Sequence, residues 1–261
     1  MQASLLASRR VSGFRPVDRT GTPSPLQGEG VAAVPFGIAA IDNALGGGLL
    51  RAALHEIAAA RESATAAASG FALAVAARIG RPRAVAWIAE DMGFIENGAP
   101  YGPGLDETGL APERLMTIAA AKSRDVLWAM EEALRCRAVG AVIGEIRSHD
   151  RAVDFTASRR LSLAAGQRGG LALLLRTEPG TDASAAASRW VIGPAPSLGT
   201  GSGPGPPRFA VRLARNRRGP LGSWMLEWNR AEQRFDLASS LSEPMADAAC
   251  DRSHRAIAAG A

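Results

Sequence analysis

The residues whose spacing points most directly to chemistry follow the first expected strand, where a nucleotide-binding protein would hold phosphate. Residues 53–75, ALHEIAAARESATAAASGFALAV, have the order strand, loop, helix. A Walker A loop, G-x-x-x-x-G-K-[ST], uses glycines for the turn, a lysine for the β- and γ-phosphates and a hydroxyl for Mg²⁺. If Leu54 to Ile57 form the strand, the four consensus positions are taken by Ala59, Ala64, Thr65 and Ala66. The layout is that of an ATPase, but the residues that grip the triphosphate have been replaced.

A different alignment of the motif does not restore it, because Lys122 is the only lysine in the chain and lies far outside this unit. A lysine is the residue that reaches the β/γ oxygens in such loops. The sequence therefore favours binding over catalysis, and it predicts neither a cofactor nor a metal ion.

Two acids follow two of the expected strands. Glu90 comes after the strand 84–89, and Glu145 comes after the strand 138–143. In open α/β sheets, ligands bind outside the carboxyl ends of the strands. Glu90 stands where a RecA-type ATPase keeps the carboxylate that activates water, and Glu145 stands where a Walker B acid holds Mg²⁺. Without a phosphate loop we interpret both as remnants, and polar strand ends are the plainer alternative.

The elements that position these residues alternate along the chain. Short apolar strands are expected at 54–57, 84–89, 114–119, 138–143 and 171–175, and helices at 66–79, from Ser123 onward, and from Asp154 or Thr156 to about Gln167. Ser123 is expected to cap its helix. Continuous apolar strands separated by helices predict an α/β fold with a mostly parallel sheet, covered by helices on both faces.

A different pattern begins near residue 189. Residues 208–214 and 223–228 alternate between apolar and polar side chains around an Arg-Arg-Gly-Pro turn, which predicts an antiparallel hairpin at the sheet edge. Five arginines are expected on this ribbon: Arg208, Arg212, Arg215, Arg217 and Arg218. They form either a surface for DNA or an acidic partner, or a charged edge that blocks aggregation between sheets.

Length and composition set the organisation of the chain. The 261 residues, 47% of them hydrophobic, predict one folded domain at 34–237 with a flexible Gly/Pro loop at 193–207, between disordered ends at 1–33 and 238–261. The net charge is +5, and 29 of the 30 basic residues are arginine, which fits either a GC-rich genome or a nucleic-acid partner. Two cysteines, no apolar run of ~18 residues and no secretory signal predict a protein of the reducing cytoplasm.

Several short segments together resemble one family. They are residues 35–42 (PFGIAAID), 45–49 (LGGGL), 53–57 (ALHEI), 101–105 (YGPGL), 127–134 (LWAMEEAL), 161–165 (LSLAA) and the RRGP turn before Trp224. Over roughly residues 34–237 the chain resembles RecA-like ATPase cores and, more closely, the ImuA family of bacterial inducible-mutagenesis cassettes. Members of that family commonly lack a complete Walker A motif, which agrees with the loop described above.

The resemblance implies a RecA-like core that supports SOS-induced, error-prone translesion DNA synthesis without being an enzyme. It implies two partners, an ImuB-type inactive Y-family polymerase relative and an error-prone polymerase α subunit. RecA, and DNA at the hairpin arginines, are further candidate contacts, and no membrane contact is expected. The resemblance does not extend to strand exchange, and residues 146–153 are the nearest candidate for a DNA-binding loop. The alternatives are a divergent RecA-type ATPase with a nonstandard nucleotide site, and an SOS regulator of cell division.

Overall fold

The structure is a computed structural model that describes residues 32–79, 82–146, 152–197, 199 and 205–238. The expected disordered ends at 1–33 and 238–261 therefore lie outside the described residues, except for 32–33 and 238. Most of the candidate DNA-binding loop, residues 147–151, also lies outside them. No helix in the described part of the chain combines the length and the apolar character that crossing a membrane requires.

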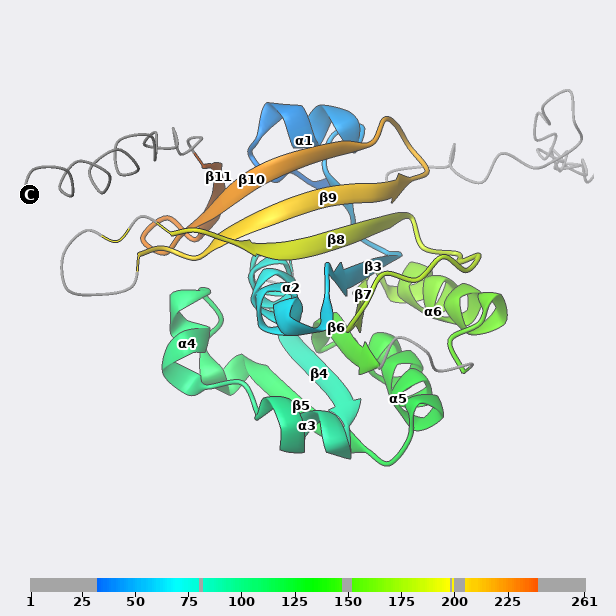
Figure 1. Cartoon of the computed structure of the whole chain (residues 1–261). Helices are drawn as coiled ribbons and strands as arrows, with labels where there is room; N and C mark the ends of the chain where they lie inside the picture. The colour runs from blue at the N-terminus through cyan, green and yellow to red at the C-terminus, as the bar shows by residue number, and fades with distance from the viewer. Residues whose placement is uncertain (1–31, 80–81, 147–151, 198, 200–204, 239–261) are drawn as a thin grey trace, which may run out of the picture. The chain divides into compact units, whose positions relative to one another are not determined.

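Within the described residues, nine strands form one sheet in the order β11-β10-β9-β8-β3-β7-β6-β4-β5 (Figure 1). Six of them are parallel, as the apolar runs predict. They are β3 (Ala53–Ala59), β4 (Ala84–Glu90), β5 (Leu115–Ala120), β6 (Val139–Ile146), β7 (Leu171–Arg176) and β8 (Ser188–Ala195). The antiparallel extension is formed by β9 (Arg208–Asn216), β10 (Gly222–Asn229) and β11 (Arg234–Leu237). The predicted α/β class with an added C-terminal hairpin is confirmed.

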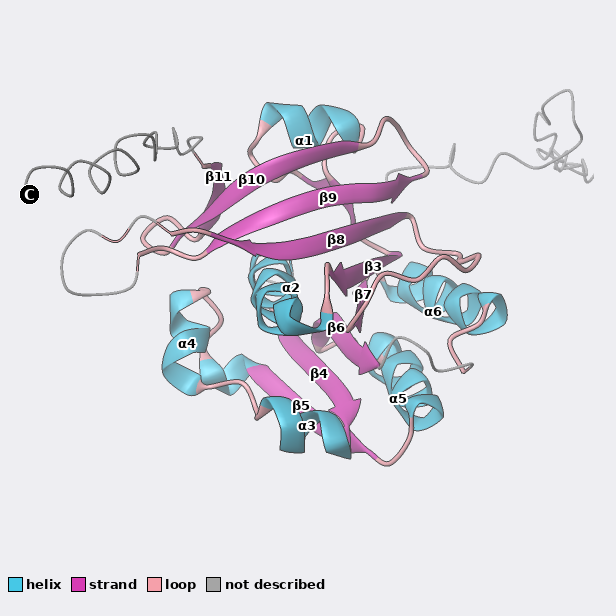
Figure 2. Cartoon of the chain, viewed as in Figure 1, coloured by secondary structure: helices cyan, strands magenta, loops and turns pink. Residues whose placement is uncertain are grey.

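Helices pack against both faces of the parallel strands (Figure 2). Helix α2 (Thr65–Ile79) covers one face, while α5 (Ser123–Arg135) and α6 (Phe155–Arg168) pack against each other on the opposite face. Shorter elements complete the fold: β1 (Ala33–Val34), α1 (Ala39–Ala44), β2 (Leu49–Leu50), α3 (Asp91–Asn97) and α4 (Gly102–Glu107). The sequence pattern did not predict α3 and α4.

The core beneath α2 is built around aromatic rings. Phe71 of α2 lies 5.2 Å from Phe235 and 6.2 Å from Trp190, measured between ring centroids, and all three side chains are almost fully buried. Such pairs add roughly 0.5–1.5 kcal/mol each beyond the burial of their area. Because Phe235 belongs to β11, this cluster joins the antiparallel extension to the parallel core.

The turn between β9 and β10 rests on the glycine turn that follows α1. The Asn216 Nδ2 donates to the carbonyl oxygen of Ala44 at 2.7 Å. A Cβ added at Gly219 would overlap that same carbonyl oxygen, so the close approach requires glycine. The Gly46–Gly48 triplet has positive φ throughout, which agrees with its interpretation as a plain turn.

Two local expectations were wrong. Ser123 is the first helical residue of α5 and not its cap, and its hydroxyl hydrogen-bonds the Glu90 carboxylate instead. The loop expected over 193–207 starts later, because residues 193–195 continue β8, and residues 198 and 200–204 lie outside the described part. Asp154 does cap α6, since its Oδ1 accepts from the Ala157 amide at 2.7 Å.

Candidate functional site

The four degenerate phosphate-loop residues lie where the motif would place them. Ala59 ends β3, Ala64 closes a short 3₁₀ turn (Glu62–Ala64), and Thr65 and Ala66 open α2. Ala59 and Ala64 are almost fully buried, whereas the Thr65 hydroxyl donates to the carbonyl oxygen of Glu62 at 2.6 Å. The strand–loop–helix connection is therefore present, but it carries methyl groups where glycines would give a phosphate access to the backbone.

The backbone of this loop is also committed to the protein itself. The Ala60 amide donates to the Ile192 carbonyl oxygen at 2.7 Å, and the Ala64 amide donates to the Arg61 carbonyl oxygen at 2.8 Å. The Thr65 amide bonds the Glu62 carbonyl oxygen. In a working phosphate loop, such amides point at the phosphate oxygens. Three of the donors that would define the site are thus already used.

One cation in the loop was not singled out from the sequence. Arg61 lies between the two former glycine positions, and its Nε donates to the Ser63 hydroxyl at 2.8 Å from an exposed position. The sequence signal that could have identified Arg61 is a basic residue within the segment aligned with the phosphate loop. The adjacent Glu62 places a negative charge in the same turn and opposes the binding of an anion there.

The sheet brings the two acids together. Glu145 lies opposite Ala89 in the β4–β6 register, one residue from Glu90. It belongs to β6 itself, which extends to Ile146, and so it does not follow a strand that ends at residue 143. The strand end expected at residue 143 is therefore too early.

Both carboxylates are occupied by side chains of the protein. Glu90 accepts from the Ser123 hydroxyl, and Glu145 Oε1 accepts from the Asn97 Nδ2 at 3.1 Å. Burial raises the pKa of Glu145, and the Glu90 charge raises it further, while hydrogen bonds from Trp87 and Asn97 act in the opposite direction.

A cavity of about 470 Å³ lies beside these acids, between α2 on one side and α3 and α4 on the other. Its wall includes Thr65, Ser69, Trp87, Asn97, Tyr101 and Glu145, and no Lys, Arg or His lines it among the described residues. Asn97 and Tyr101 come from the part of the chain whose helices the sequence did not predict. Among the residues that the structure describes, no three His, Cys, Asp or Glu side chains gather closely enough to hold a metal ion.

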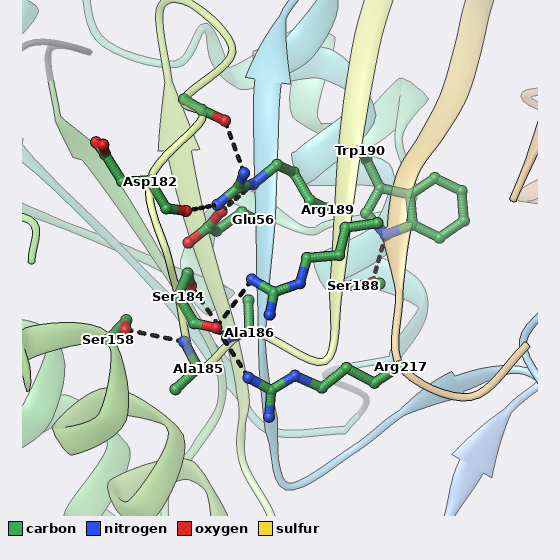
Figure 3. Close-up of polar contacts among 12 residues, drawn as sticks. Glu56, Ser158, Asp182, Ser184, Ala185, Ala186, Ser188, Arg189, Trp190 and Arg217 are labelled. Carbon is green, nitrogen blue, oxygen red and sulfur yellow. Dashed lines mark hydrogen bonds and ion pairs between the residues drawn. The ribbon is translucent and has the colours of Figure 1, made fainter. Parts of the chain in front are cut away.

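The hairpin arginines do not form the continuous exposed surface that the alternation predicted. Arg208 is buried, and its Nε pairs with the Glu227 carboxylate at 2.6 Å, which corrects the expectation that it faces solvent. Arg218 is exposed and donates to the Gly46 carbonyl oxygen at 2.8 Å. Arg215 and Arg217 both donate to the carbonyl oxygen of Ser184 (Figure 3). Of the five, Arg212 alone remains an exposed side chain on a strand face.

A buried ion pair close to this group was missed from the sequence. The Arg189 Nε lies 2.5 Å from the Glu56 Oε2, and the other guanidinium nitrogens of Arg189 donate to the carbonyl oxygens of Gly180 and Asp182 (Figure 3). A glutamate in the middle of an otherwise apolar strand was the only signal. The pair ties the β7–β8 connection to the centre of the sheet.

No protein-family model matches the chain. Two curated relatives do: Protein ImuA from Caulobacter vibrioides, in strain NA1000 / CB15N and in strain ATCC 19089 / CIP 103742 / CB 15, is 32% identical over 244 residues. The alignments cover 86% of this chain and 93% of each relative. This chain belongs to the ImuA family. The resemblance seen in the short segments of the sequence is thereby confirmed.

Solved structures add the fold of this ImuA-family chain. The crystal structure of the RadB recombinase matches it with a TM-score of 0.52 and 15% sequence identity, covering 78% of this chain and 99% of that chain. At this identity, the likeness shows the fold alone. The fold is RecA-like.

Proposed function

We propose that this chain is a non-catalytic, RecA-like accessory protein that supports SOS-induced, error-prone translesion DNA synthesis through contacts with other proteins. Membership of the ImuA family and the RecA-like fold support the role. The observation that carries the non-catalytic part is the state of the loop, because the amides of Ala60, Ala64 and Thr65 are bonded internally. Losing the lysine and these donors together removes most of the electrostatic stabilisation on which phosphoryl transfer depends.

The proposed partners are an ImuB-type inactive Y-family polymerase relative and an error-prone polymerase α subunit, with RecA as a further contact. The protein would meet them in the cytoplasm, where damaged DNA is copied. Exposed apolar side chains offer surfaces for such contacts, notably Ile95 on α3, Trp128 on α5 and Leu163 on α6. A pull-down with the full chain from DNA-damaged cells tests the proposal, and recovery of neither polymerase would contradict it.

The catalytic question has its own experiment. We expect the purified protein to hydrolyse ATP no faster than a buffer control. In a host whose own copy is deleted, damage-induced mutation frequency should be restored equally by the wild type, Thr65→Ala and Glu145→Gln, with the deletion as the reference for complete loss. ATP turnover that disappears in Glu90→Gln would refute the non-catalytic assignment.

A divergent ATPase is the second candidate, and two specific observations favour it. Arg61 supplies a cation within the loop, and Glu90 and Glu145 remain side by side at the carboxyl ends of β4 and β6. An Arg61→Gln variant distinguishes the two functions. If the protein is a divergent ATPase, this substitution should abolish nucleotide binding. If it is an accessory protein, the variant should recover the same partners as the wild type in the pull-down.

A further inference from the structure

Two arginines at the end of the hairpin converge on a single neutral oxygen. Arg215 lies near the end of β9 and Arg217 lies in the turn that follows. The Arg215 Nη1 lies 3.0 Å from the carbonyl oxygen of Ser184, and the Arg217 Nη2 lies 2.8 Å from the same atom. Figure 3 shows the Arg217 guanidinium directed at the Ser184 carbonyl oxygen, which accepts from both arginines. Two positive charges therefore share an acceptor that carries no charge of its own.

The Glu56 carboxylate, drawn in the same close-up, is already paired. Glu56 pairs with Arg189, whose remaining nitrogens are bonded to the carbonyl oxygens of Gly180 and Asp182. The Asp182 carboxylate points away from Arg217 in Figure 3. Among the described residues, neither Arg215 nor Arg217 forms an ion pair with a carboxylate. This part of the surface therefore carries an excess of positive charge, which favours the binding of an anion.

The physical consequence appears at Arg217. Burial lowers the pKa of its guanidinium, and the neighbouring charge of Arg215 lowers it further, with no acid acting in the opposite direction. Arg217 is nevertheless exposed and Arg215 is half-buried, so an ion arriving from solvent can reach both. Each guanidinium has five N–H donors in a rigid fork. The structure shows one bonded nitrogen on each, which leaves donors for a ligand.

We propose that Arg215 and Arg217 form a binding site for a phosphate group. Two planar guanidinium forks match the oxygens of a phosphate bidentately, and these charge-assisted hydrogen bonds are about twice as strong as neutral ones. The bound anion would also relieve the repulsion between the two side chains. The phosphate belongs either to the backbone of DNA or to a free ion, and the site does not depend on the accessory role proposed above.

The first arm of the test uses the full chain and inorganic phosphate. Thermal melting is followed during titration with sodium phosphate, with sodium chloride of equal ionic strength as the reference. We expect phosphate to raise the Tm of the wild type, because a ligand of the folded state stabilises it by mass action. Removing one fork, in Arg215→Gln or Arg217→Gln, should weaken phosphate binding roughly tenfold.

Arg218→Gln is the matched control, since Arg218 lies in the same turn but bonds the Gly46 carbonyl oxygen. It should keep the phosphate response of the wild type. Phosphate also stabilises proteins by exclusion from their surface, and that effect would persist in every variant. An equal phosphate response in the wild type, Arg217→Gln and Arg218→Gln would therefore overturn the site.

A second measurement guards against a simple loss of folding. Arg215 and Arg217 also hold the β7–β8 connection through Ser184, so their removal lowers stability by itself. Phosphate binding is therefore also measured by ³¹P NMR at a temperature where each variant is folded. Arg217→Lys keeps the charge but lacks the fork, and we expect it to bind phosphate better than Arg217→Gln and more weakly than the wild type. A wild type that shows no ³¹P response would overturn the proposal.

The last arm identifies the source of the phosphate. Binding of a fluorescein-labelled, 20-nucleotide single strand is measured by anisotropy at several NaCl concentrations. If the site holds a DNA phosphodiester, the negative slope of log K against log salt should become shallower by about 1 in the double variant Arg215→Gln/Arg217→Gln. An unchanged slope overturns DNA as the source and leaves the free ion. Poly-glutamate that competes better than phosphate would overturn the choice of phosphate itself.

Discussion

His55 shows how a single side chain links the sequence to stability. It is fully buried on β3, where its Nε2 donates to the Leu50 carbonyl oxygen and its Nδ1 accepts from the Ser188 hydroxyl. The Ser188 oxygen in turn accepts from the Trp190 indole N–H. Burial lowers the pKa of His55 to about 4, so the folded protein holds this ring neutral.

This arrangement predicts a loss of stability in mild acid. Between pH 6.5 and about 4 the unfolded chain binds a proton at His55 and the folded chain does not. The contribution of His55 to the free energy of unfolding should therefore be fully present above pH 6.5 and decrease as the pH falls. At pH 4 the loss from this group should be roughly 3 kcal/mol. Urea denaturation at a series of pH values measures it. His55→Gln should flatten this part of the profile, and an unchanged profile in the variant would show that other groups control it.

Removing the charge of Glu145 is expected to stabilise the folded protein. Because burial raises its pKa, the ionised form destabilises the folded protein at neutral pH. Glu145→Gln keeps the shape and a group that can accept from Asn97, so it should raise the Tm at pH 7.5 and have less effect near pH 4. Calorimetry of the wild type and the variant at both pH values provides the comparison. A lower Tm at pH 7.5 would mean that the carboxylate is held by stabilising contacts.

At the scale of elements, the packing of α5 on the sheet depends on a glycine. A Cβ added at Gly144 in β6 would overlap the fully buried Met130 side chain of α5. Overpacking of this kind usually costs about 1–3 kcal/mol. Gly144→Ala should therefore lower the free energy of unfolding by about that amount, measured by chemical denaturation.

Gly104 in α4 provides the control for that substitution. The nearest atom to a Cβ added there is the Tyr101 Cδ1 at 4.0 Å, an ordinary contact. Alanine is favoured over glycine inside a helix by up to about 1 kcal/mol. Gly104→Ala should leave stability unchanged or raise it. Equal destabilisation by both substitutions would show that the Met130 contact is not the cause.

At the scale of the whole molecule, a RecA-like fold carries a loop without the consensus residues of a Walker A motif. The sheet places Glu145 beside the end of β4, and α2 follows β3, whereas the amides of Ala60 and Ala64 are bonded inside the protein. We expect 1 mM Mg·ATP to leave the Tm of the full chain within error of the buffer value. A dissociation constant weaker than about 1 mM adds less than about 0.4 kcal/mol at that concentration. A clear, saturable rise in Tm would support the divergent ATPase instead.

The alternation of apolar segments was enough to predict much of the fold. Runs such as 84–89 and 171–175 are buried on both sides, and such runs with helical segments between them give parallel strands. The absence of a lysine from this loop could also be read directly, because folding cannot change which residues a segment contains. Family membership followed from the order of several short segments, none of which is decisive alone.

Tertiary structure decided which polar residues meet. Arg208 and Arg212 look equivalent in an alternating strand, yet Arg208 finds Glu227 on the next strand and Arg212 stays exposed. The pairs of Glu56 with Arg189 and of Arg217 with Ser184 each join residues more than 30 positions apart. Periodicity reports which face a side chain takes, because that is a local property of the backbone. The hydrogen-bond or ion-pair partner of that side chain depends on how distant elements pack, so only the folded chain determines it.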